Sequence, residues 1–367
     1  MTKDNENKLV ILTAGGTGGH IYPAEALAGE LINRGYQVVL FTDERGLNNY
    51  KGKLGEIENK AILSGSVVGK SIFTKVKSLI KVSFGVIQAF VELFKRHPIC
   101  VVGFGGYASF PTAIASILHG VPLIIHEQNS VMSRTNRILA RFSTFVAQSF
   151  SNVKNTPSIA KSILTGMPVR SSIVDLYKNT YKAVDANGKI NLVVIGGSQG
   201  ATVFAETIPN AIALLSKEEQ EKLNIYQQCR KGEEEFVNDK YKGLSVNVEV
   251  KSFFDNMPEL YEKASVIVSR SGASSVYEIA VAGVPSILVP LPTSADNHQY
   301  FNAMEIIGSG GGIVLEQKDF DAKVLSKHLS NFISNPQILV KMSAEVKKKA
   351  IVDAASRLAD MVEKFIK

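Results

Sequence analysis

Short apolar segments alternate with longer amphipathic segments along the chain, and glycine stands at most of the junctions. Residues 8–14, KLVILTA, and residues 36–42, YQVVLFT, have the continuous apolar character of buried strands. Residues 23–35, PAEALAGELINRG, lie between them with the period of a helix. This alternation is typical of βαβ units, which form parallel sheets. The sequence therefore predicts an α/β fold.

The same plan restarts halfway along the chain. Residues 189–196, KINLVVIG, lead through a glycine break into a helical segment at 201–215. Two later segments, ILHGVPLIIH and IAVAGVPSILV, both indicate a helix end, a Gly-x-Pro stop and a buried strand. A chain of 367 residues is also about twice the usual domain length. We expect an amino-terminal domain in residues 1–166, a polar, turn-rich linker in 167–189 and a carboxyl-terminal domain in 190–367, with a last amphipathic helix that fits on either domain.

The composition is that of a globular protein, with 45% hydrophobic and 20% charged residues. The net charge of +7 favours anionic partners without separating nucleic acid, membrane surfaces and phosphorylated metabolites. Two cysteines, Cys100 and Cys229, have no metal-ligand spacing, so we expect neither a disulfide framework nor a zinc site. The polar start MTKDNENK argues against a secretory signal, and no apolar stretch reaches the length of a spanning helix.

Two glycine-rich breaks, AGGTGGH at 14–20 and IGGSQGA at 195–201, follow strands and precede helices. Bare backbone and a helix amino terminus together form an anion site, which Thr17 and Ser198 reinforce with hydroxyls. Neither break fits the dinucleotide fingerprint, which would need glycine at Ile21, or the Walker A motif. Two breaks in equivalent positions favour phosphate binding over tight packing alone.

Polar residues follow other predicted strands. VVGFGGYASFP, at 101–111, offers a further phosphate loop, and His126, Glu127, Gln128 and Asn129 end the strand LIIHE. Open α/β sheets place ligands at this end of their strands. His20 lies at the start of the first helix, where the helix dipole lowers its pKa and favours a neutral imidazole that can accept a proton; a locally bonded structural histidine is the alternative.

The second half carries matching candidates. In VIVSRSGASSVYEIAVAG we expect Glu278 near a helix start, either to accept from ribose hydroxyls or as a favourable charge at the helix terminus. Asp296, Asn297, His298 and Gln299 follow another strand and suggest a sugar site. The Asp-x-Asp string of Asp319 and Asp321 is interpreted as helix capping and not as a metal site.

A basic segment spans residues 69–97. It interleaves apolar residues with Lys70, Lys75, Lys77, Lys81, Lys95 and Arg96, against Glu92 alone. This pattern predicts either contact with an anionic lipid surface or two ordinary amphipathic helices covering the sheet.

The strings AGGTGGH, GFGGYAS, HEQN, GMPVR, GGSQGA, SRSGASSVYE and HQYFNA occur in an order that closely resembles the MurG family, over nearly the whole chain. Its members are bacterial enzymes that transfer GlcNAc from UDP-GlcNAc to undecaprenyl-pyrophosphoryl-MurNAc-pentapeptide. The resemblance implies a GT-B architecture of two Rossmann-like domains facing a central cleft. It implies a peripheral enzyme on the cytoplasmic face of the cell membrane that needs no metal or other cofactor, takes part in peptidoglycan synthesis with other cell-wall proteins as partners, and binds no nucleic acid.

The family pattern also assigns residues. The implied donor contacts are Thr17, Gly18, Gly19, Asn129, Arg170, Ser198, Phe254, Ala273, Ser274, Ser275, Val276, Tyr277, Glu278 and Gln299. The implied acceptor contacts are Gly16, Gly105, Gly106 and Tyr107. His20 is the predicted general base, with Glu127 and His126 as substitutes. The chain departs from many relatives at Met167, at His298 and at Ser274-Ser275.

Three other functions remain as alternatives. An NAD-dependent oxidoreductase would use Asp43 as its ribose acid, against which the failed fingerprint weighs. A nucleotide-sugar binding protein would bind UDP-GlcNAc without turnover. A GT-B UDP-GlcNAc 2-epimerase would need no lipid-binding segment.

Overall fold

The computed structural model describes residues 8–15, 18–49, 53–65, 72–196, 202–308 and 310–366. The chain divides into two compact units, residues 1–170 with 351–367 and residues 171–350. The boundary differs from the predicted one because residues 171–189 are no free linker. Ile173 and Leu176 are buried, and the Tyr181 hydroxyl donates to the Ser265 carbonyl at 2.6 Å, within the second unit.

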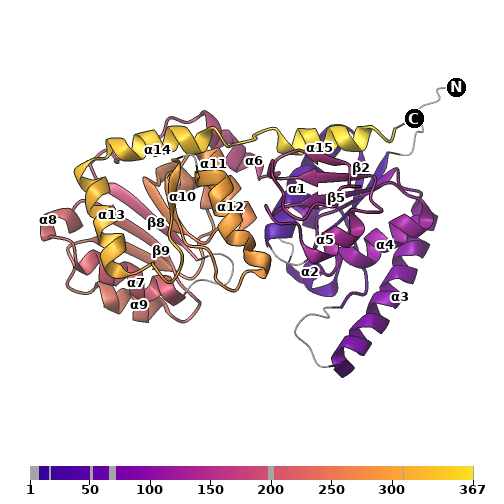
Figure 1. Cartoon of the computed structure of the whole chain (residues 1–367), viewed down its shortest axis with the longest axis horizontal. Coiled ribbons are helices and arrows are strands. Elements are labelled where there is room, and N and C mark those ends of the chain that lie inside the picture. Colours follow the sequence, from indigo (N-terminus) through magenta and orange to yellow (C-terminus); the bar gives the residue numbers. More distant parts are fainter. Residues whose placement is uncertain are drawn as a thin grey trace. The chain divides into compact units, whose positions relative to one another are not determined.

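The first unit contains a parallel sheet of seven strands among the described residues, in the order β3-β2-β1-β4-β5-β6-β7. These strands are β1 (Leu9–Thr13), β2 (Gln37–Thr42), β3 (Glu58–Ala61), β4 (Cys100–Gly103), β5 (Leu123–Glu127), β6 (Phe145–Gln148) and β7 (Ser162–Leu164). Its helices are α1 (Gly18–Asn33), α2 (Glu44–Asn49), α3 (Ile72–Arg96), α4 (Ser109–His119), α5 (Arg134–Leu139) and α15 (Ala354–Glu363) (Figure 1).

Alternating side chains of these strands pack against helices on both faces. Val10, Leu12 and Leu40 lie in one buried cluster with residues of α1 and α15, and Ile11 and Val39 lie in another with residues of α3, α4 and α5. The last helix therefore belongs to the first unit, one of the two placements that the sequence left open, and the second unit ends at residue 350. α15 runs beside α1 in Figure 1, and Arg34, the residue that follows α1, pairs with Asp360 at 2.7 Å.

The second unit repeats this topology with a parallel sheet in the order β10-β9-β8-β11-β12-β13, within the described ranges. Its strands are β8 (Ile190–Ile195), β9 (Leu223–Gln228), β10 (Asn247–Lys251), β11 (Val266–Ser269), β12 (Ser286–Leu288) and β13 (Gly312–Val314). Its helices are α6 (Ser171–Val174), α7 (Thr202–Ala213), α8 (Lys217–Gln220), α9 (Glu234–Tyr241), α10 (Met257–Lys263), α11 (Ala273–Ala282), α12 (His298–Ile307), α13 (Ala322–Ser334) and α14 (Gln337–Lys347).

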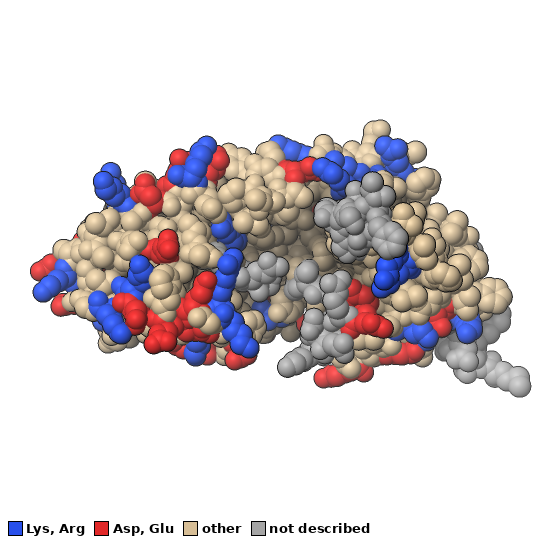
Figure 2. Space-filling view, turned by 90° about the horizontal axis from the view of Figure 1, so that it is seen from below, with Lys and Arg blue, Asp and Glu red and all other residues tan. Residues whose placement is uncertain are grey.

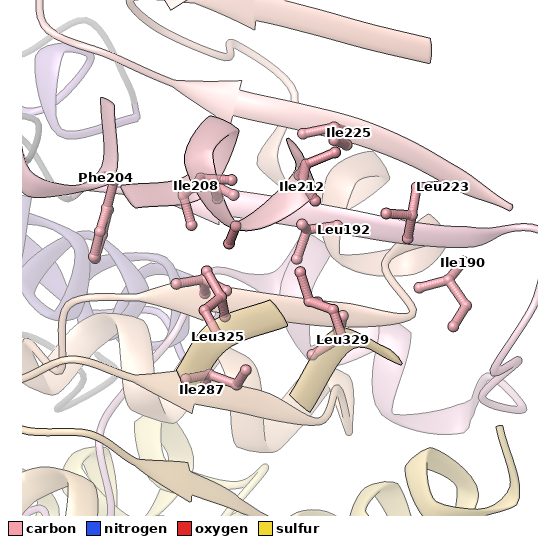
Figure 3. Close-up of a cluster of buried hydrophobic side chains, with 14 of the residues drawn as sticks. Ile190, Leu192, Phe204, Ile208, Ile212, Leu223, Ile225, Ile287, Leu325 and Leu329 are labelled. Atoms are coloured by element: carbon pink, nitrogen blue, oxygen red, sulfur yellow. The ribbon is translucent and has the colours of Figure 1, made fainter. Parts of the chain in front are cut away.

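One face of this second sheet is covered mainly by α7, α9 and α13. Figure 3 shows Phe204 and Ile208 of α7 and Leu325 of α13 directed at apolar side chains of β8, β9 and β12. The predicted architectural repeat is confirmed by the matching strand orders of the two sheets and by two matching helix ends. Gly120 and Gly283 end α4 and α11 in the left-handed conformation, with φ of 78° and 69°, which side chains with a Cβ rarely adopt.

In both units the first strand lies inside the sheet. The next strand in the chain pairs with one of its edges, and a later strand pairs with the other. β1 pairs with β2 and β4, and β8 pairs with β9 and β11. In open parallel sheets, ligands bind beyond the carboxyl ends of the strands at such a switch point. None of the described helices is both long enough and apolar enough to cross a membrane.

Candidate active site

In the first unit, the loops after β1 and β4 pack backbone against backbone. The amide of Gly15 donates to the carbonyl of Gly105 at 3.0 Å. Gly105 and Gly106 have φ of +86° and +80°, and a Cβ on Gly106 would lie 2.8 Å from the Gly15 Cα. These glycines are therefore required by the close approach of the two loops. Gly16 and Thr17, the predicted anion contacts, lie outside the described residues.

His20 lies in the first turn of α1, as predicted. Its Nδ1 is 2.7 Å from Oε1 of Gln128, and Nε2 of Gln128 donates to the Phe104 carbonyl at 2.6 Å. Burial lowers the pKa of His20, while the hydrogen bonds to Gln128 and Phe104 oppose this shift. The direction agrees with the prediction, although burial is the main cause. A neutral imidazole at this position can accept a proton.

Glu127 and His126, the predicted substitutes for the base, are both buried and bonded. Oε1 of Glu127 accepts from the Asn129 amide at 3.0 Å, and Oε2 accepts from the Ser133 amide at 3.0 Å and Asn136 Nδ2 at 2.8 Å. Burial raises the pKa of Glu127, and these donors oppose the shift. A carboxylate surrounded by its own loop's donors organises that loop and presents no oxygen to a substrate.

His126 is fully buried beneath the loop that follows Leu164. Its Nε2 lies 3.2 Å from the Gly166 carbonyl and 3.4 Å from the Ser149 hydroxyl. Burial lowers its pKa to about 4. This geometry does not support the prediction that His126 substitutes as the base, since a fully enclosed ring cannot reach a sugar hydroxyl.

The remaining candidates of the first unit occupy the carboxyl end of its sheet. Gly18 and Gly19 open α1, Tyr107 is exposed in the loop before α4, and the guanidinium of Arg170 lies 4.6 Å from the ring centre of Tyr22. Met167, a departure from the family pattern, is fully buried and accepts from the Ser149 hydroxyl.

In the second unit, the loop after β8 contains Ser198, which lies outside the described residues. The neighbouring strand β11 leads through Ser271 into α11, which begins at the predicted contact Ala273. The hydroxyl oxygens of Ser271 and Ser274 are buried and have no hydrogen-bond partner in the described structure. Such atoms usually have a partner, so two beside one helix start favour a polar ligand there.

Glu278 is buried in the middle of α11, not near its start as predicted. Its Oε2 accepts from the Tyr261 hydroxyl at 3.0 Å. The helix begins five residues before Glu278, with no acidic residue in its first turn. The alternative role as a charge at the helix amino terminus is therefore wrong. Val276 and Tyr277 are buried beside it, and Ser275 is half-buried.

The segment before α12 is held in an unusual conformation. Asp296 and Asn297 are consecutive residues in the left-handed region, with φ of 51° and 53°. They lead directly into His298, which bonds the Ala295 carbonyl at 2.8 Å, and Gln299, whose Oε1 accepts from the Leu291 amide at 3.0 Å. Strained residues of this kind gather at ligand sites. Phe254, one of the implied donor contacts, is buried in the same unit.

Sequence reasoning did not assign a role to Arg270. Its guanidinium donates to the Val289 and Pro290 carbonyls at 3.0 and 3.3 Å and to Gln317 at 2.7 Å. It also lies 5.3 Å from the ring centre of Phe204. Arg270 thus ties together the segments that follow β11, β12 and β13. An arginine directly after a buried strand, in the string SRSG, was the available signal.

The Asp-x-Asp string caps a helix, as predicted. Oδ1 of Asp321 accepts from the Val324 amide at 2.8 Å at the start of α13. Across the described ranges, no group of three or more histidine, cysteine, aspartate or glutamate side chains is placed to hold a metal ion.

Comparisons with known proteins give one consistent result. Residues 10–148 match the glycosyltransferase family 28 N-terminal domain, and residues 191–358 match the glycosyltransferase family 28 C-terminal domain. A Rhodospirillum rubrum protein is 41% identical over 96% of this chain and 91% of its own length, and a Rhizobium rhizogenes protein is 40% identical over 97% and 95%. Both are named UDP-N-acetylglucosamine–N-acetylmuramyl-(pentapeptide) pyrophosphoryl-undecaprenol N-acetylglucosamine transferase.

Solved structures agree with these matches. Acinetobacter baumannii MurG superposes with a TM-score of 0.78 and 29% identity, over 97% of this chain and 99% of that one. The UDP-GlcNAc 2-epimerase of Neisseria meningitidis, bound to UDP-GlcNAc, has a TM-score of 0.71 over 97% of this chain and all of its own, but only 12% identity. The second likeness shows the shared GT-B fold alone.

Proposed function

The chain belongs to the MurG family within glycosyltransferase family 28, and from this membership we propose that it transfers GlcNAc from UDP-GlcNAc to undecaprenyl-pyrophosphoryl-MurNAc-pentapeptide. The protein is a UDP-GlcNAc-dependent glycosyltransferase of peptidoglycan synthesis. The observation that carries this conclusion is identity of about 40% that extends over nearly the whole of both chains.

The chemistry is one in-line displacement with inversion. The C4 hydroxyl of the MurNAc residue attacks the anomeric carbon of UDP-α-GlcNAc from the face opposite UDP, so a β-1,4 bond forms as the bond to the diphosphate breaks. His20 takes the hydroxyl proton as general base, a role that typically contributes 10²- to 10⁴-fold. Its half-buried, neutral ring at the carboxyl end of β1 supports this role.

The second unit holds the donor. Glu278 accepts from the ribose hydroxyls, Ser274 and Ser275 lie at the start of α11, and Gln299 bonds the GlcNAc hydroxyls. The buried, unpartnered hydroxyls of Ser271 and Ser274 support a polar ligand at this helix start. Helix amino termini, Ser198 and Arg170 stabilise the leaving diphosphate without a metal. The acceptor's pyrophosphate binds the glycine loops of the first unit, beside Tyr107.

The exposed side of α3 docks on an anionic membrane surface. Ala89 and Leu93 are buried in a cluster with residues of the sheet, so the opposite side of α3 is left exposed. The apolar residues exposed there, which we call the α3 stripe, are Val76, Leu79, Ile80, Phe84, Ile87, Phe90, Val91 and Phe94. A long row of exposed apolar side chains on one helix is typical of a surface that contacts a membrane or another protein.

The charges of α3 favour lipid over a neutral partner. Arg96 is paired with Glu58 and Glu92, whereas Lys77, Lys81 and Lys95 have no ion pair among the described residues. Figure 2 views the molecule from the side toward which α3 projects in Figure 1, and it shows uncharged surface with scattered basic and acidic side chains toward its right end. Free lysines beside an apolar stripe suit the cytoplasmic leaflet, where the polyprenyl acceptor is anchored. Lys70 lies outside the described residues.

One assay tests the function. The protein is incubated with UDP-GlcNAc, with and without a short-chain lipid-linked MurNAc-pentapeptide, and UDP release and disaccharide formation are followed. We expect UDP release only when the acceptor is present. Conversion of UDP-GlcNAc to its 2-epimer without acceptor would instead support the epimerase alternative, and binding without any turnover would support a nucleotide-sugar binding protein.

A further inference from the structure

We propose that Gln128 is a positioning residue that fixes His20 in the tautomer with its proton on Nδ1 and so leaves Nε2 as the proton acceptor. This inference rests on the proposed role of His20 as the general base. Gln128 thereby contributes to the reaction through His20 without touching the substrate, and Nε2 is the ring nitrogen that accepts the proton.

The hydrogen-bond chemistry of the chain Phe104–Gln128–His20 allows one arrangement. The Phe104 carbonyl can only accept, so the group that approaches it at 2.6 Å must be the amide nitrogen of Gln128. Oε1 of Gln128 then faces His20, at 2.7 Å from Nδ1. An amide oxygen can only accept, so Nδ1 must carry the proton. In a neutral ring the lone pair is therefore on Nε2.

The anchor of this chain is rigid. Gln128 is only 5% exposed and directly follows β5, and Phe104 is fully buried after β4. β4 and β5 are paired neighbours in the sheet, so donor and acceptor are set by the sheet itself. The amide of Gln128 therefore cannot turn over without breaking its buried hydrogen bond to the Phe104 carbonyl.

The glycines of the β4–α4 loop complete the positioning of the ring. A Cβ on Gly105 would lie 3.3 Å from Cε1 of His20, and a Cβ on Gly106 would lie 3.4 Å from Cδ2. Bare backbone at both places lets the imidazole lie against the loop. The ring is thus held by contact with the loop and by its hydrogen bond to Gln128.

Ionisable groups on the elements that adjoin His20 bear on a pH test, and they include Arg170, whose guanidinium lies 4.6 Å from the ring centre of Tyr22. His126 on β5 is uncharged above its pKa of about 4, and the Glu127 carboxyl is bonded to Asn129, Ser133 and Asn136. Tyr22 and Glu25 lie on α1 itself, and Tyr107 follows β4. The groups that bond the His20 ring, the Gln128 side-chain amide and the Phe104 backbone, are both neutral. Placing a charge at position 128 should therefore act on His20 directly.

The first experiment needs no substitution. Nitrogen-15 NMR of the full-length protein reports which ring nitrogen of each histidine carries the proton, and the His20 signals are assigned as those absent from His20→Gln. We expect the wild-type His20 ring to be neutral at pH 7.5 with its proton on Nδ1. A ring protonated on Nε2 alone would overturn the proposal.

Two variants then test the consequence for catalysis. Gln128→Leu keeps the volume but removes the acceptor, and we expect kcat to fall roughly 10- to 100-fold, the loss usual for residues that orient a catalytic group. Gln128→Glu keeps an acceptor and adds a negative charge that favours the imidazolium. It should move the acidic limb of the kcat–pH profile upward by about one pH unit or more. The control is Gln37→Leu, at the exposed start of β2, which should leave both quantities unchanged.

The readouts separate this proposal from others. If Gln128 were merely structural, Gln128→Leu and Gln128→Glu would both lower the melting temperature while the pH profile kept its midpoint, and the proposal would fail. If the chain were not a transferase, the wild type and the control variant Gln37→Leu would both show no turnover. The NMR experiment would still decide whether Gln128 fixes the tautomer of His20.

Discussion

Gly15 and Gly106 meet so closely that a Cβ on Gly106 would lie 2.8 Å from the Gly15 Cα. The two residues follow different strands and belong to loops that a local pattern does not connect. Their contact places the end of β1, and with it the start of α1 and His20, against the loop after β4. The position of His20, the predicted general base, therefore depends on glycine at both 15 and 106, because a side chain at either position would force the two loops apart.

Gly106→Ala should damage both stability and turnover. Alanine at a positive φ, with its Cβ against Gly15, should destabilise the fold by about 1–3 kcal/mol. The clash is relieved only if the two loops move apart. We expect a lower melting temperature and a lower kcat, measured by calorimetry and by UDP release. Gly29→Ala is the matched control, because a Cβ there meets nothing within 4 Å and alanine favours the helix. Equal behaviour of the two variants would contradict the contact.

Glu278→Ala should chiefly weaken donor binding. It removes a buried acceptor, and loss of a hydrogen bond to a charged group corresponds to a rise in the KM for UDP-GlcNAc on the order of 10- to 100-fold. Tyr261→Phe removes only the hydroxyl that holds Glu278 and should raise this KM by a few-fold. Steady-state kinetics at saturating acceptor gives both values. A change confined to kcat would argue against a donor contact.

His20→Ala should have the opposite profile. Without the general base, kcat should fall by about 10²- to 10⁴-fold, while the Kd for UDP-GlcNAc stays near that of the wild type. Isothermal titration with UDP-GlcNAc and single-turnover kinetics separate the two quantities. Full kcat in this variant would mean that another group takes the proton.

The buried ring of His126 makes stability depend on pH. Its folded pKa of about 4 is below its unfolded value of 6.5, so its contribution is complete above pH 6.5 and is lost as the pH falls toward 4. The loss amounts to about 3 kcal/mol at most, since one pKa unit corresponds to about 1.4 kcal/mol. Urea unfolding at pH 7 and pH 4.5 should show a smaller decline for His126→Gln than for the wild type. Equal declines would show that the ring is not the source.

The α3 stripe gives a prediction about membranes. Ile80→Asp combined with Phe84→Asp should reduce sedimentation with vesicles that contain anionic lipid, since both side chains are more than half exposed and insertion of carboxylates is unfavourable. Turnover of a water-soluble acceptor analogue should remain near the wild-type level. Leu214→Asp, an equally exposed apolar position in the second unit, is the control. Undiminished vesicle binding of the double variant would exclude the stripe as the contact.

The sequence predicted structure correctly where a single residue type is needed for a particular backbone conformation. Gly120 and Gly283 could be identified as helix ends because the left-handed conformation there is a property of one residue. The contact between His20 and Gln128 joins residues 108 positions apart, so no local pattern reports it. Residues 167–189 were predicted as a linker from their polarity, but a few apolar anchors such as Ile173 and Leu176 suffice to fold residues 171–189 into the second unit.

The return of the last helix to the first unit has a consequence for biogenesis. Leu358 and Val362 of α15 fill the same buried cluster as Leu27 and Leu31 of α1, near the opposite end of the chain. A growing polypeptide therefore cannot complete its first unit until α15 has left the ribosome. The second unit, although made later, has all of its own strands and helices first.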